Sequence, residues 1–348
     1  MERVSRLRWH WGAVALCAPW FPGAALAQRA PAPEPANRVS SQGIPDWLEM
    51  LPKTSAARQF GVFASGSGVA QDRGVPSKSP GRAPSKLDFN QDTMADLLFQ
   101  NLSTSELVYW LMDGDRLMNY GYINPSKPGM NWAVAGSGDF SGTGKTDLVL
   151  QATDTGDLIY WRLDGPNQID VQYFTPRNPG LYWDVVSAAD INRDGSPDLV
   201  FQNRLTGDIF IWYMHGTTMI AGAYINPKNP GSGWKVAAVG DLNGDGYADF
   251  VFQKKVLTPD DSAGAVYVWY MQTDTQIGGG FLNPANPGAG WNVAGLVDFL
   301  GQGRPQILFQ NAGTGDLAYW IMDGLNLVRY DFPKPNNPGR MWKLVGSK

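Results

Sequence analysis

The feature that most constrains this chain is a repeat marked by tryptophan. Two series of tryptophans recur through about the last three quarters of the sequence, and neighbouring members lie 51 residues apart except for a single interval of 57. A period of this length is typical of propellers and solenoids, in which each repeat is one supersecondary unit. The first series is Trp110, Trp161, Trp212, Trp269 and Trp320, and the second is Trp132, Trp183, Trp234, Trp291 and Trp342.

Each repeat contains four short segments that are rich in Val, Ile, Tyr and Trp and separated by turns with glycine. In the third repeat these segments are 183–187, 198–203, 208–214 and 218–225. Such a pattern is typical of strands joined in hairpins. A proline-rich segment then leads to the next tryptophan. We interpret it as a connector and not as a central strand, because proline cannot donate a hydrogen bond to a neighbouring strand. The sequence therefore predicts repeats of four antiparallel strands, starting at about residues 88, 139, 190, 241 and 298.

The ends of the repeat region indicate how it closes. A tryptophan-containing strand segment, 341–346, follows the fifth repeat, whereas none precedes Asp88. We expect this C-terminal strand to complete the first blade. The predicted fold is all-β, a five-bladed β-propeller of four-stranded antiparallel blades over residues 87–348. The additional residues of the longer interval fall at 254–263, which we interpret as a longer surface turn.

An acidic loop lies between the first two strand segments of each repeat. In three repeats, carboxylate or amide oxygens stand at loop positions 1, 3, 5 and 9, a ligand set that suits Ca²⁺. An EF-hand would need Glu at position 12, where this chain has Phe99, Phe201 and Phe252. The candidate ligands are Asp88, Asn90, Asp92 and Asp96; Asp190, Asn192, Asp194 and Asp198; and Asp241, Asn243, Asp245 and Asp249.

Two further loops depart from this pattern. The loop of the second repeat keeps both terminal carboxylates but has hydroxyls between them, so Asp139, Ser141, Thr143 and Asp147 form a weaker candidate site. The loop from Asp298 to Gln306 has lost most of its charge and is expected to bind no metal. We therefore predict about three calcium ions and a weaker fourth site.

The recurring Asp-x-Asn-x-Asp-Gly-x-x-Asp loop, together with the lead-in from Trp234 to Asp241, resembles the FG-GAP/VCBS repeat family. The resemblance covers about residues 86–348. It implies a calcium-bearing β-propeller with its metal ligands at the loop residues named above. Members of this integrin-alpha-like family include adhesion heads, lectins and appendages of extracellular enzymes.

Two side-chain series fit either a structural role or a ligand site. Tryptophans of the first series could pack between blades, or they could stack on the apolar faces of sugars. A glutamine also recurs beside each apolar run; if buried it would need hydrogen-bond partners across blades, and if exposed it would form a five-fold ligand-binding set. The candidate ligand-binding residues are Trp110, Trp161, Trp212, Trp269 and Trp320, with Gln100, Gln151, Gln202, Gln253 and Gln310.

The N-terminal part differs from the repeats. Arg3, Arg6 and Arg8 precede an apolar stretch that ends in Ala25-Leu26-Ala27, which predicts a secretory signal peptide over 1–27. The only cysteine, Cys17, lies inside it, so the exported chain would hold no disulfide. Residues 28–86 are rich in Pro, Gly and Ser and predict a flexible tether with a short helix near 45–52. We expect an extracellular or periplasmic location.

Composition narrows the function. The net charge of −4 and the lack of a basic patch argue against nucleic-acid binding, and no amphipathic membrane helix is evident, so no membrane insertion is expected. Beyond the signal peptide the only histidine is His215, in a turn, and we find no motif for catalysis. The leading hypothesis is a secreted, calcium-stabilised module, not an enzyme, that binds carbohydrate on a surface or matrix. The alternatives are a protein-interaction or adhesion module and a polysaccharide-active extracellular enzyme.

Overall fold

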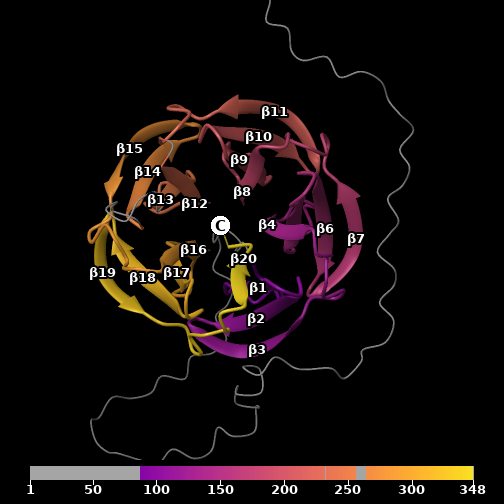
Figure 1. Ribbon diagram of the computed structural model, residues 1–348, viewed down its shortest axis with the longest axis horizontal. Helices are drawn as coiled ribbons and strands as arrows, with labels where there is room; N and C mark the ends of the chain where they lie inside the picture. Colours follow the sequence, from indigo (N-terminus) through magenta and orange to yellow (C-terminus); the bar gives the residue numbers. More distant parts are fainter. Residues whose placement is uncertain (1–86, 232, 256–263, 348) are drawn as a thin grey trace, which may run out of the picture. The chain divides into compact units, whose positions relative to one another are not determined.

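The computed structural model describes residues 87–347, apart from 232 and 256–263. These residues form twenty strands and no helix, arranged in five antiparallel four-stranded sheets. The sheets stand as blades around a common axis (Figure 1). The predicted all-β, five-bladed propeller is therefore confirmed.

The blades follow the chain in order. Blade 1 contains β20 (Trp342–Val345), β1 (Leu97–Asn101), β2 (Leu107–Asp113) and β3 (Arg116–Tyr122). Blade 2 contains β4 (Trp132–Gly138), β5 (Asp147–Ala152), β6 (Leu158–Asp164) and β7 (Asn167–Tyr173), and blade 3 contains β8 (Trp183–Ala189), β9 (Asp198–Asn203), β10 (Ile209–His215) and β11 (Thr218–Tyr224). Blade 4 contains β12 (Trp234–Gly240), β13 (Asp249–Lys254), β14 (Val266–Gln272) and β15 (Thr275–Phe281), and blade 5 contains β16 (Trp291–Val297), β17 (Gln306–Asn311), β18 (Leu317–Asp323) and β19 (Asn326–Asp331).

Blade 1 joins the two ends of the described chain. Its inner strand, β20, pairs antiparallel with β1, with Leu344 opposite Phe99. The other inner strands are β4, β8, β12 and β16, and the outer ones are β3, β7, β11, β15 and β19 (Figure 1). The prediction that the C-terminal strand closes the first blade is thus confirmed.

The hydrophobic core lies between neighbouring blades. The second strand of each blade is almost entirely buried, as in β9 and β13, because both of its faces meet apolar side chains. One cluster, for example, combines Phe140 and Tyr160 of blade 2 with Phe201 and Trp212 of blade 3. A run of apolar residues in these strands, without alternation, is what burial on two faces requires.

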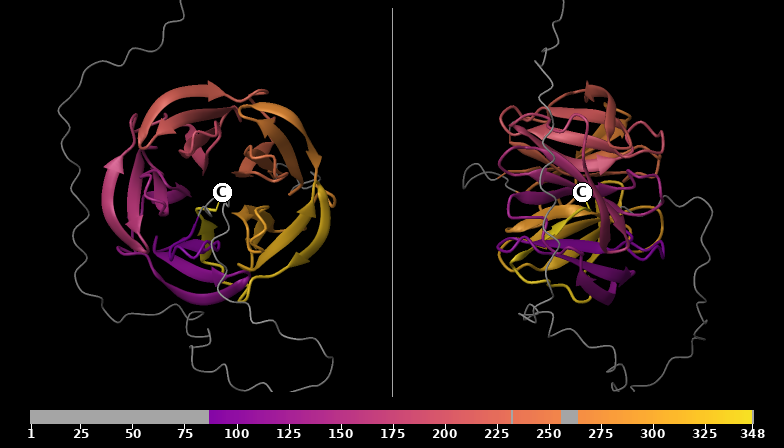
Figure 2. Two further views of the ribbon diagram at one scale, coloured as in Figure 1. Left: turned by 180° about the vertical axis from the view of Figure 1, so that it is seen from behind. Right: turned by 90° about the vertical axis from the view of Figure 1, so that its right-hand side faces the viewer.

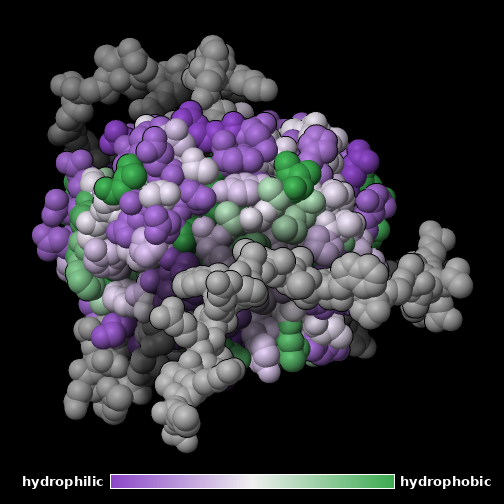
Figure 3. Space-filling view, turned by 90° about the horizontal axis from the view of Figure 1, so that it is seen from above, coloured by the Kyte–Doolittle hydropathy of each residue, from purple (hydrophilic) through white to green (hydrophobic). Residues whose placement is uncertain are grey.

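The outer strands instead alternate between partly buried and exposed residues. Each exposes an aliphatic side chain at the equivalent position: Met118, Ile169, Ile220, Ile277 and Val328. On the side of the ring that Figure 3 shows, hydrophobic side chains stand apart among hydrophilic ones. The loops lie at the two faces of the ring (Figure 2), and loops are where binding residues most often occur.

Several predictions fall outside the described residues. These are the signal peptide at 1–27, the tether at 28–86 with its short helix near 45–52, and most of the longer turn at 254–263. Within the part of the chain that the structure describes, no helix is long and apolar enough to cross a membrane.

Candidate functional site

The first aspartate of every acidic loop closes the loop on itself. Asp190 accepts hydrogen bonds from the backbone N–H groups of Asp194 (3.1 Å) and Gly195 (3.0 Å). Gly195 has a φ of 88°, a conformation that glycine adopts without strain. Asp298 makes the same two contacts in the fifth loop, which was expected to bind no metal. The first aspartate therefore shapes the turn in loops with and without a full ligand set.

The ninth residue of the loop is a buried anchor. In blade 3, Asp198 accepts hydrogen bonds from the N–H of Ile191 (3.0 Å) within the loop and of Met214 (2.9 Å) in β10. Burial raises the pKa of Asp198 to about 6, against the hydrogen bonds that lower it. Burial likewise raises the pKa of Asp249 to about 6 and that of Asp96 to about 7. The structure thus places these three predicted ligands where both carboxylate oxygens already accept backbone hydrogen bonds.

The fifth residue of the loop is exposed, and the third is exposed or partly buried. Asn192 donates from Nδ2 to Asp194 Oδ2 (2.8 Å), and the N–H of Asp194 lies near oxygens of both Asp190 (3.1 Å) and Asn192 (3.0 Å). Oxygens from loop positions 1 and 3 therefore converge on one point. The same contacts occur in the loop with Asp88, Asn90 and Asp92 and in the loop with Asp241, Asn243 and Asp245.

This donor set consists of oxygen atoms, which fits a hard cation such as Ca²⁺. Within the described residues, however, no group of three or more His, Cys, Asp or Glu side chains is gathered closely enough to hold a metal ion. In the weaker loop, the Ser141 hydroxyl donates to Asp147 (2.8 Å) and lies 2.9 Å from that of Thr143, while Asp139 accepts from backbone N–H groups. Calcium binding therefore stays a prediction.

The recurring glutamines link neighbouring blades. Gln202 of blade 3 donates to the carbonyl of Trp234 (3.2 Å) and accepts from the N–H of Val236 (2.9 Å) in blade 4. Each amide is thereby satisfied by backbone groups of the next blade. The equivalent pairs of contacts join Gln100 to Trp132 and Val134, Gln151 to Trp183 and Val185, Gln253 to Trp291 and Val293, and Gln310 to Trp342 and Leu344.

The first tryptophan series is buried between blades. Trp110, Trp161, Trp212, Trp269 and Trp320 are at most 8% exposed. Each of four of them packs on a phenylalanine of its own blade, as Trp269 does on Phe252 at 4.7 Å between ring centres. Trp212 and Trp269 also line pockets. The structure thus places most of this series and all five glutamines in contacts that hold the ring together.

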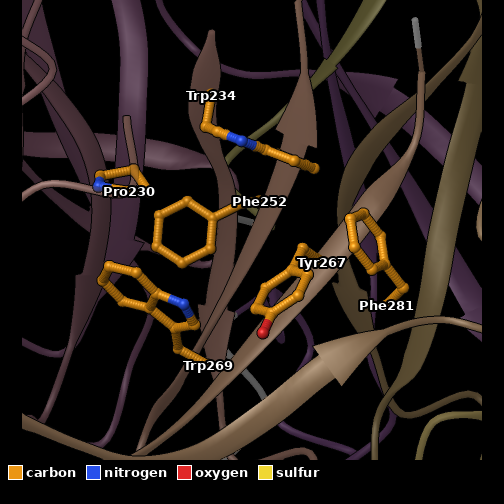
Figure 4. A pocket seen from close by; sticks show the side chains of 6 residues that line it. All are labelled: Pro230, Trp234, Phe252, Tyr267, Trp269 and Phe281. Carbon is orange, nitrogen blue, oxygen red and sulfur yellow. The ribbon is translucent and has the colours of Figure 1, made fainter. Parts of the chain in front are cut away.

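Two pockets with aromatic walls lie at equivalent places on blades 3 and 4. The pocket of blade 4 has a volume of about 220 Å³ (Figure 4), and that of blade 3 about 210 Å³. Equivalent lining residues of the two pockets are 51 or 57 positions apart in the sequence, which are the two intervals of the repeat. They are Pro230, Trp234, Phe252, Tyr267, Trp269 and Phe281 in blade 4, and Pro179, Trp183, Phe201, Phe210, Trp212 and Tyr224 in blade 3.

The register of the strands explains the blade 4 pocket. Phe252, Tyr267 and Phe281 stand opposite one another on β13, β14 and β15, so their side chains share one face of the sheet. Tyr267 packs edge-on against Phe281 at 4.8 Å, and Trp234 lies 6.0 Å from Phe281. Figure 4 shows the Tyr267 hydroxyl and the two indole nitrogens as the polar side-chain atoms of this wall.

Sequence reasoning missed Pro230, Trp234, Tyr267 and Phe281 as pocket residues. A signal was present, because β10 and β14 carry an aromatic residue, Phe210 or Tyr267, where the other repeats have an aliphatic one. Those residues are Val108, Ile159 and Ala318.

The equivalent aromatic ring is covered by a cation in two other blades. In blade 3, Lys228 lies over the ring of Tyr224 at 5.4 Å and forms an ion pair with Asp208 at 3.2 Å. In blade 2, Arg177 lies 4.4 Å from the centre of the Tyr173 ring and pairs with Asp157. Blade 4 has alanine at both positions, Ala265 and Ala285. Its pocket therefore lacks the charged pair that borders the other two rings.

Five repeats closed into a ring, each with an acidic loop and an interblade glutamine, define a five-bladed β-propeller. Its sequence matches the FG-GAP-like repeat at residues 139–201 and 190–252, each of which runs from one acidic loop to the next repeat's second strand. The protein is thus a five-bladed β-propeller, and the repeats that begin at about 139, 190 and 241 contain the FG-GAP-like sequence that the resemblance predicted.

A comparison with curated proteins finds no match. Among solved structures, a chain of the Photorhabdus luminescens Tc holotoxin pore is similar at 18% identity, with a TM-score of 0.38 over 71% of this chain. This chain spans 12% of the length of that one. A likeness at this level carries no argument about function.

Proposed function

We propose that this propeller is a carbohydrate-binding module and that the pocket of blade 4 is its ligand site. The observation that supports the proposal is an aromatic wall on which no charged side chain of the described residues lies. The rings of Trp234 and Phe281 offer flat surfaces to the apolar C–H face of a sugar, while the Tyr267 hydroxyl can bond a sugar hydroxyl. The ligand would be a glycan on a cell surface or in a matrix.

The ion pairs explain why blade 4 is preferred over blade 3. A sugar that stacks on Tyr224 would have to displace Lys228 from the ring and separate it from Asp208. Both contacts would be lost on binding, so only the surplus would appear as affinity. No such contact has to be broken at Phe281, because Ala265 and Ala285 cannot form it.

A glycan array in calcium-containing buffer tests the proposal, followed by two variants at the pocket. Phe281→Ala should abolish binding, and the double change Ala265→Asp with Ala285→Lys should weaken it by installing the pair of blade 3. Ile277→Ala, on the same strand and 59% exposed, is the matched control. Silence on the array, together with tight binding to one protein, would reject the carbohydrate proposal.

We also propose that Ca²⁺ binds the loops at 88–96, 190–198 and 241–249, and more weakly the loop at 139–147. The side chains at positions 1, 3, 5 and 9 would hold the ion, since a carboxylate oxygen that accepts one backbone hydrogen bond, as in Asp190 and Asp198, keeps a second lone pair. A bound cation would neutralise the carboxylates that crowd each turn. The signal peptide that the sequence predicts would take the protein to an extracellular or periplasmic location, and binding there needs no catalytic group.

A second candidate function, protein interaction, is favoured by an apolar arc on one face of the ring. Leu102 and Met341 of blade 1 are joined by a backbone hydrogen bond (2.8 Å), as are Arg204 and Tyr182 of blade 3. The arc consists of Leu102, Met130, Leu181, Tyr182, Leu205 and Met341, which are 39–69% exposed. Grouped exposed apolar residues mark interaction sites. Leu181→Asp should then prevent capture of a protein partner while leaving glycan binding intact.

A further inference from the structure

Each inner strand begins with a tryptophan of the second series. The residue that follows this tryptophan occupies the same level around the propeller axis in every blade. These five axial positions are Ala133, Asp184, Lys235, Asn292 and Lys343. Each is paired in register with the interblade glutamine of its blade, as Lys235 is with Gln253 and Lys343 with Gln100. The inner strands surround the axis (Figure 1), so these five residues stand around it on neighbouring blades.

Blades 3 and 4 carry differently charged side chains at two equivalent positions. In blade 3, Asp184 forms an ion pair with Arg204 at 3.2 Å. The equivalent residues of blade 4 are Lys235 and Lys255. Their backbones correspond as well, because Arg204 donates to the carbonyl of Tyr182 and Lys255 donates to that of Gly233, both at 2.8 Å. The positions that hold an attractive ion pair in blade 3 therefore hold two positively charged ammonium groups in blade 4.

A third lysine adds to this cluster from another blade. Lys343 of β20 lies close enough to act on Lys235, since burial first, then Lys343 and then Lys255 lower the pKa of Lys235. Asn292 of β16 stands between these two strands in the ring. Among the described residues, Lys235, Lys255 and Lys343 therefore have no carboxylate as an ion-pair partner.

We propose that Lys235, Lys255 and Lys343 form a binding site for an oxyanion at this end of the axis. Placing like charges together on a half-buried lysine costs free energy unless a ligand compensates them. An oxyanion has several acceptor oxygens and can receive charge-assisted hydrogen bonds from more than one ammonium group. The ligand class is a sulfate, phosphate or carboxylate group, either as a free ion or as a substituent of an acidic sugar.

This site is separate from the aromatic pocket. Lys235 follows Trp234 in β12, so its side chain points to the opposite face of the blade 4 sheet. The inference therefore stands whether or not the aromatic pocket binds a sugar.

The experiment measures anion binding to the full chain by calorimetry and thermal unfolding, with sodium sulfate compared against sodium chloride at equal ionic strength. We expect saturable binding of sulfate and a higher melting temperature. Lys235→Met and, separately, Lys343→Met should each weaken binding by about tenfold or more, since each removes a charge-assisted contact. Lys127→Met is the matched control, because Lys127 already pairs with Glu106 at 3.3 Å.

Without anion, Lys235→Met should also raise the melting temperature by removing the repulsion, which shows that the variant is folded. A sulfated oligosaccharide in a second arm distinguishes the two sources: tighter binding than inorganic sulfate, in competition with it, identifies an acidic glycan, and equal or weaker binding identifies a free ion. The proposal is overturned if sulfate acts no differently from chloride, or if both lysine variants respond as the control does.

Discussion

At the scale of single residues, this ring is held together by side chains that satisfy backbone groups of a neighbouring element. Gln202 is the clearest example, since its one amide bonds both a carbonyl and an N–H of blade 4. Asp198 does the same within blade 3, between the acidic loop and β10. Polar residues at fixed places in a repeat therefore need not mark a ligand site, because buried backbone groups also demand partners.

Removing one interblade amide gives a direct measure of this role. We expect Gln202→Ala to lower the free energy of unfolding by about 1–3 kcal/mol, because the Val236 N–H and the Trp234 carbonyl lose their buried partner. Urea denaturation would measure the change. Gln172→Ala is the control, since that amide bonds Asp170 at an exposed place on β7. Equal stability of the two variants would contradict a stabilising role for the interblade amide of Gln202.

At the scale of elements, each acidic loop combines a structural turn with a candidate metal site. The anchoring residues are positions 1 and 9, whereas positions 3 and 5 are partly or fully exposed and bond mainly within the loop. The two roles can therefore be separated by mutation. The neutral Gln306 of blade 5 still accepts from the N–H of Phe299 (2.8 Å), which indicates that the anchor does not require charge.

Calcium removal tests the metal role and its dependence on loop position. We expect EDTA to lower the melting temperature, and calcium at 100 times its Kd to stabilise each loop by about 2.7 kcal/mol. Asp194→Ala should reduce the response to calcium while changing the stability of the metal-free protein little. Asp198→Ala should destabilise the metal-free protein itself, by about 1–3 kcal/mol, because the N–H groups of Ile191 and Met214 lose their acceptor.

A variant of the first loop residue in blade 5 provides the reference. Asp298→Ala changes a loop that has lost most of its other acidic ligands, so it should leave the calcium response intact. A melting curve of the wild-type protein that EDTA does not shift would contradict calcium binding altogether.

The elements themselves could be predicted closely from the sequence. In the third repeat, segments were expected at 198–203, 208–214 and 218–225, and the strands are β9 at Asp198–Asn203, β10 at Ile209–His215 and β11 at Thr218–Tyr224. These boundaries follow from local signals, namely β-branched and aromatic runs that end at glycine turns. The repeat period supplied the number of blades because each unit needs neighbours to bury its faces.

The pocket could not be predicted in the same way because it is not local. Pro230 comes from a connector, and Trp234, Phe252, Tyr267 and Phe281 come from four strands, so their meeting depends on strand register. Whether a charged side chain covers the wall depends on two more residues, Ala265 and Ala285. Their importance is evident only because the equivalent residues of blade 3 form an ion pair. The glutamine partners, 32 to 40 residues away in the next blade, could not be predicted for the same reason.

At the scale of the whole molecule, the ring is closed at both its inner and its outer edge. Outer strands are joined through the connectors: Asn226 donates to Asp274 (2.7 Å) and accepts from Gln276 (2.8 Å), which bridges blades 3 and 4. The same pair of bonds closes blade 5 onto blade 1, where Lys334 donates to Asp115 and accepts from Leu117. At the inner edge, closure depends on β20.

Strand β20 contributes to closure in two directions, and its loss should therefore affect the whole ring. It pairs with β1 of its own blade, and its Leu344 N–H and Trp342 carbonyl bond Gln310 of blade 5. Deletion of 341–348 would leave β1 with an open edge and Gln310 without its partners, while Trp342, Leu344 and Val345 would leave the core. We expect the melting temperature to fall, the transition to broaden and the chain to self-associate, since an exposed β-edge pairs with other chains.

A synthetic peptide of residues 338–348, added in trans, should restore the cooperative transition in thermal unfolding and the monomer peak in size-exclusion chromatography. The matched control is the same peptide with Leu344 replaced by proline, which cannot donate to Gln310. If the truncated chain instead unfolds at the wild-type temperature without added peptide, the backbone bridges at the outer edge suffice for closure. The inner strand would then serve only to fill blade 1.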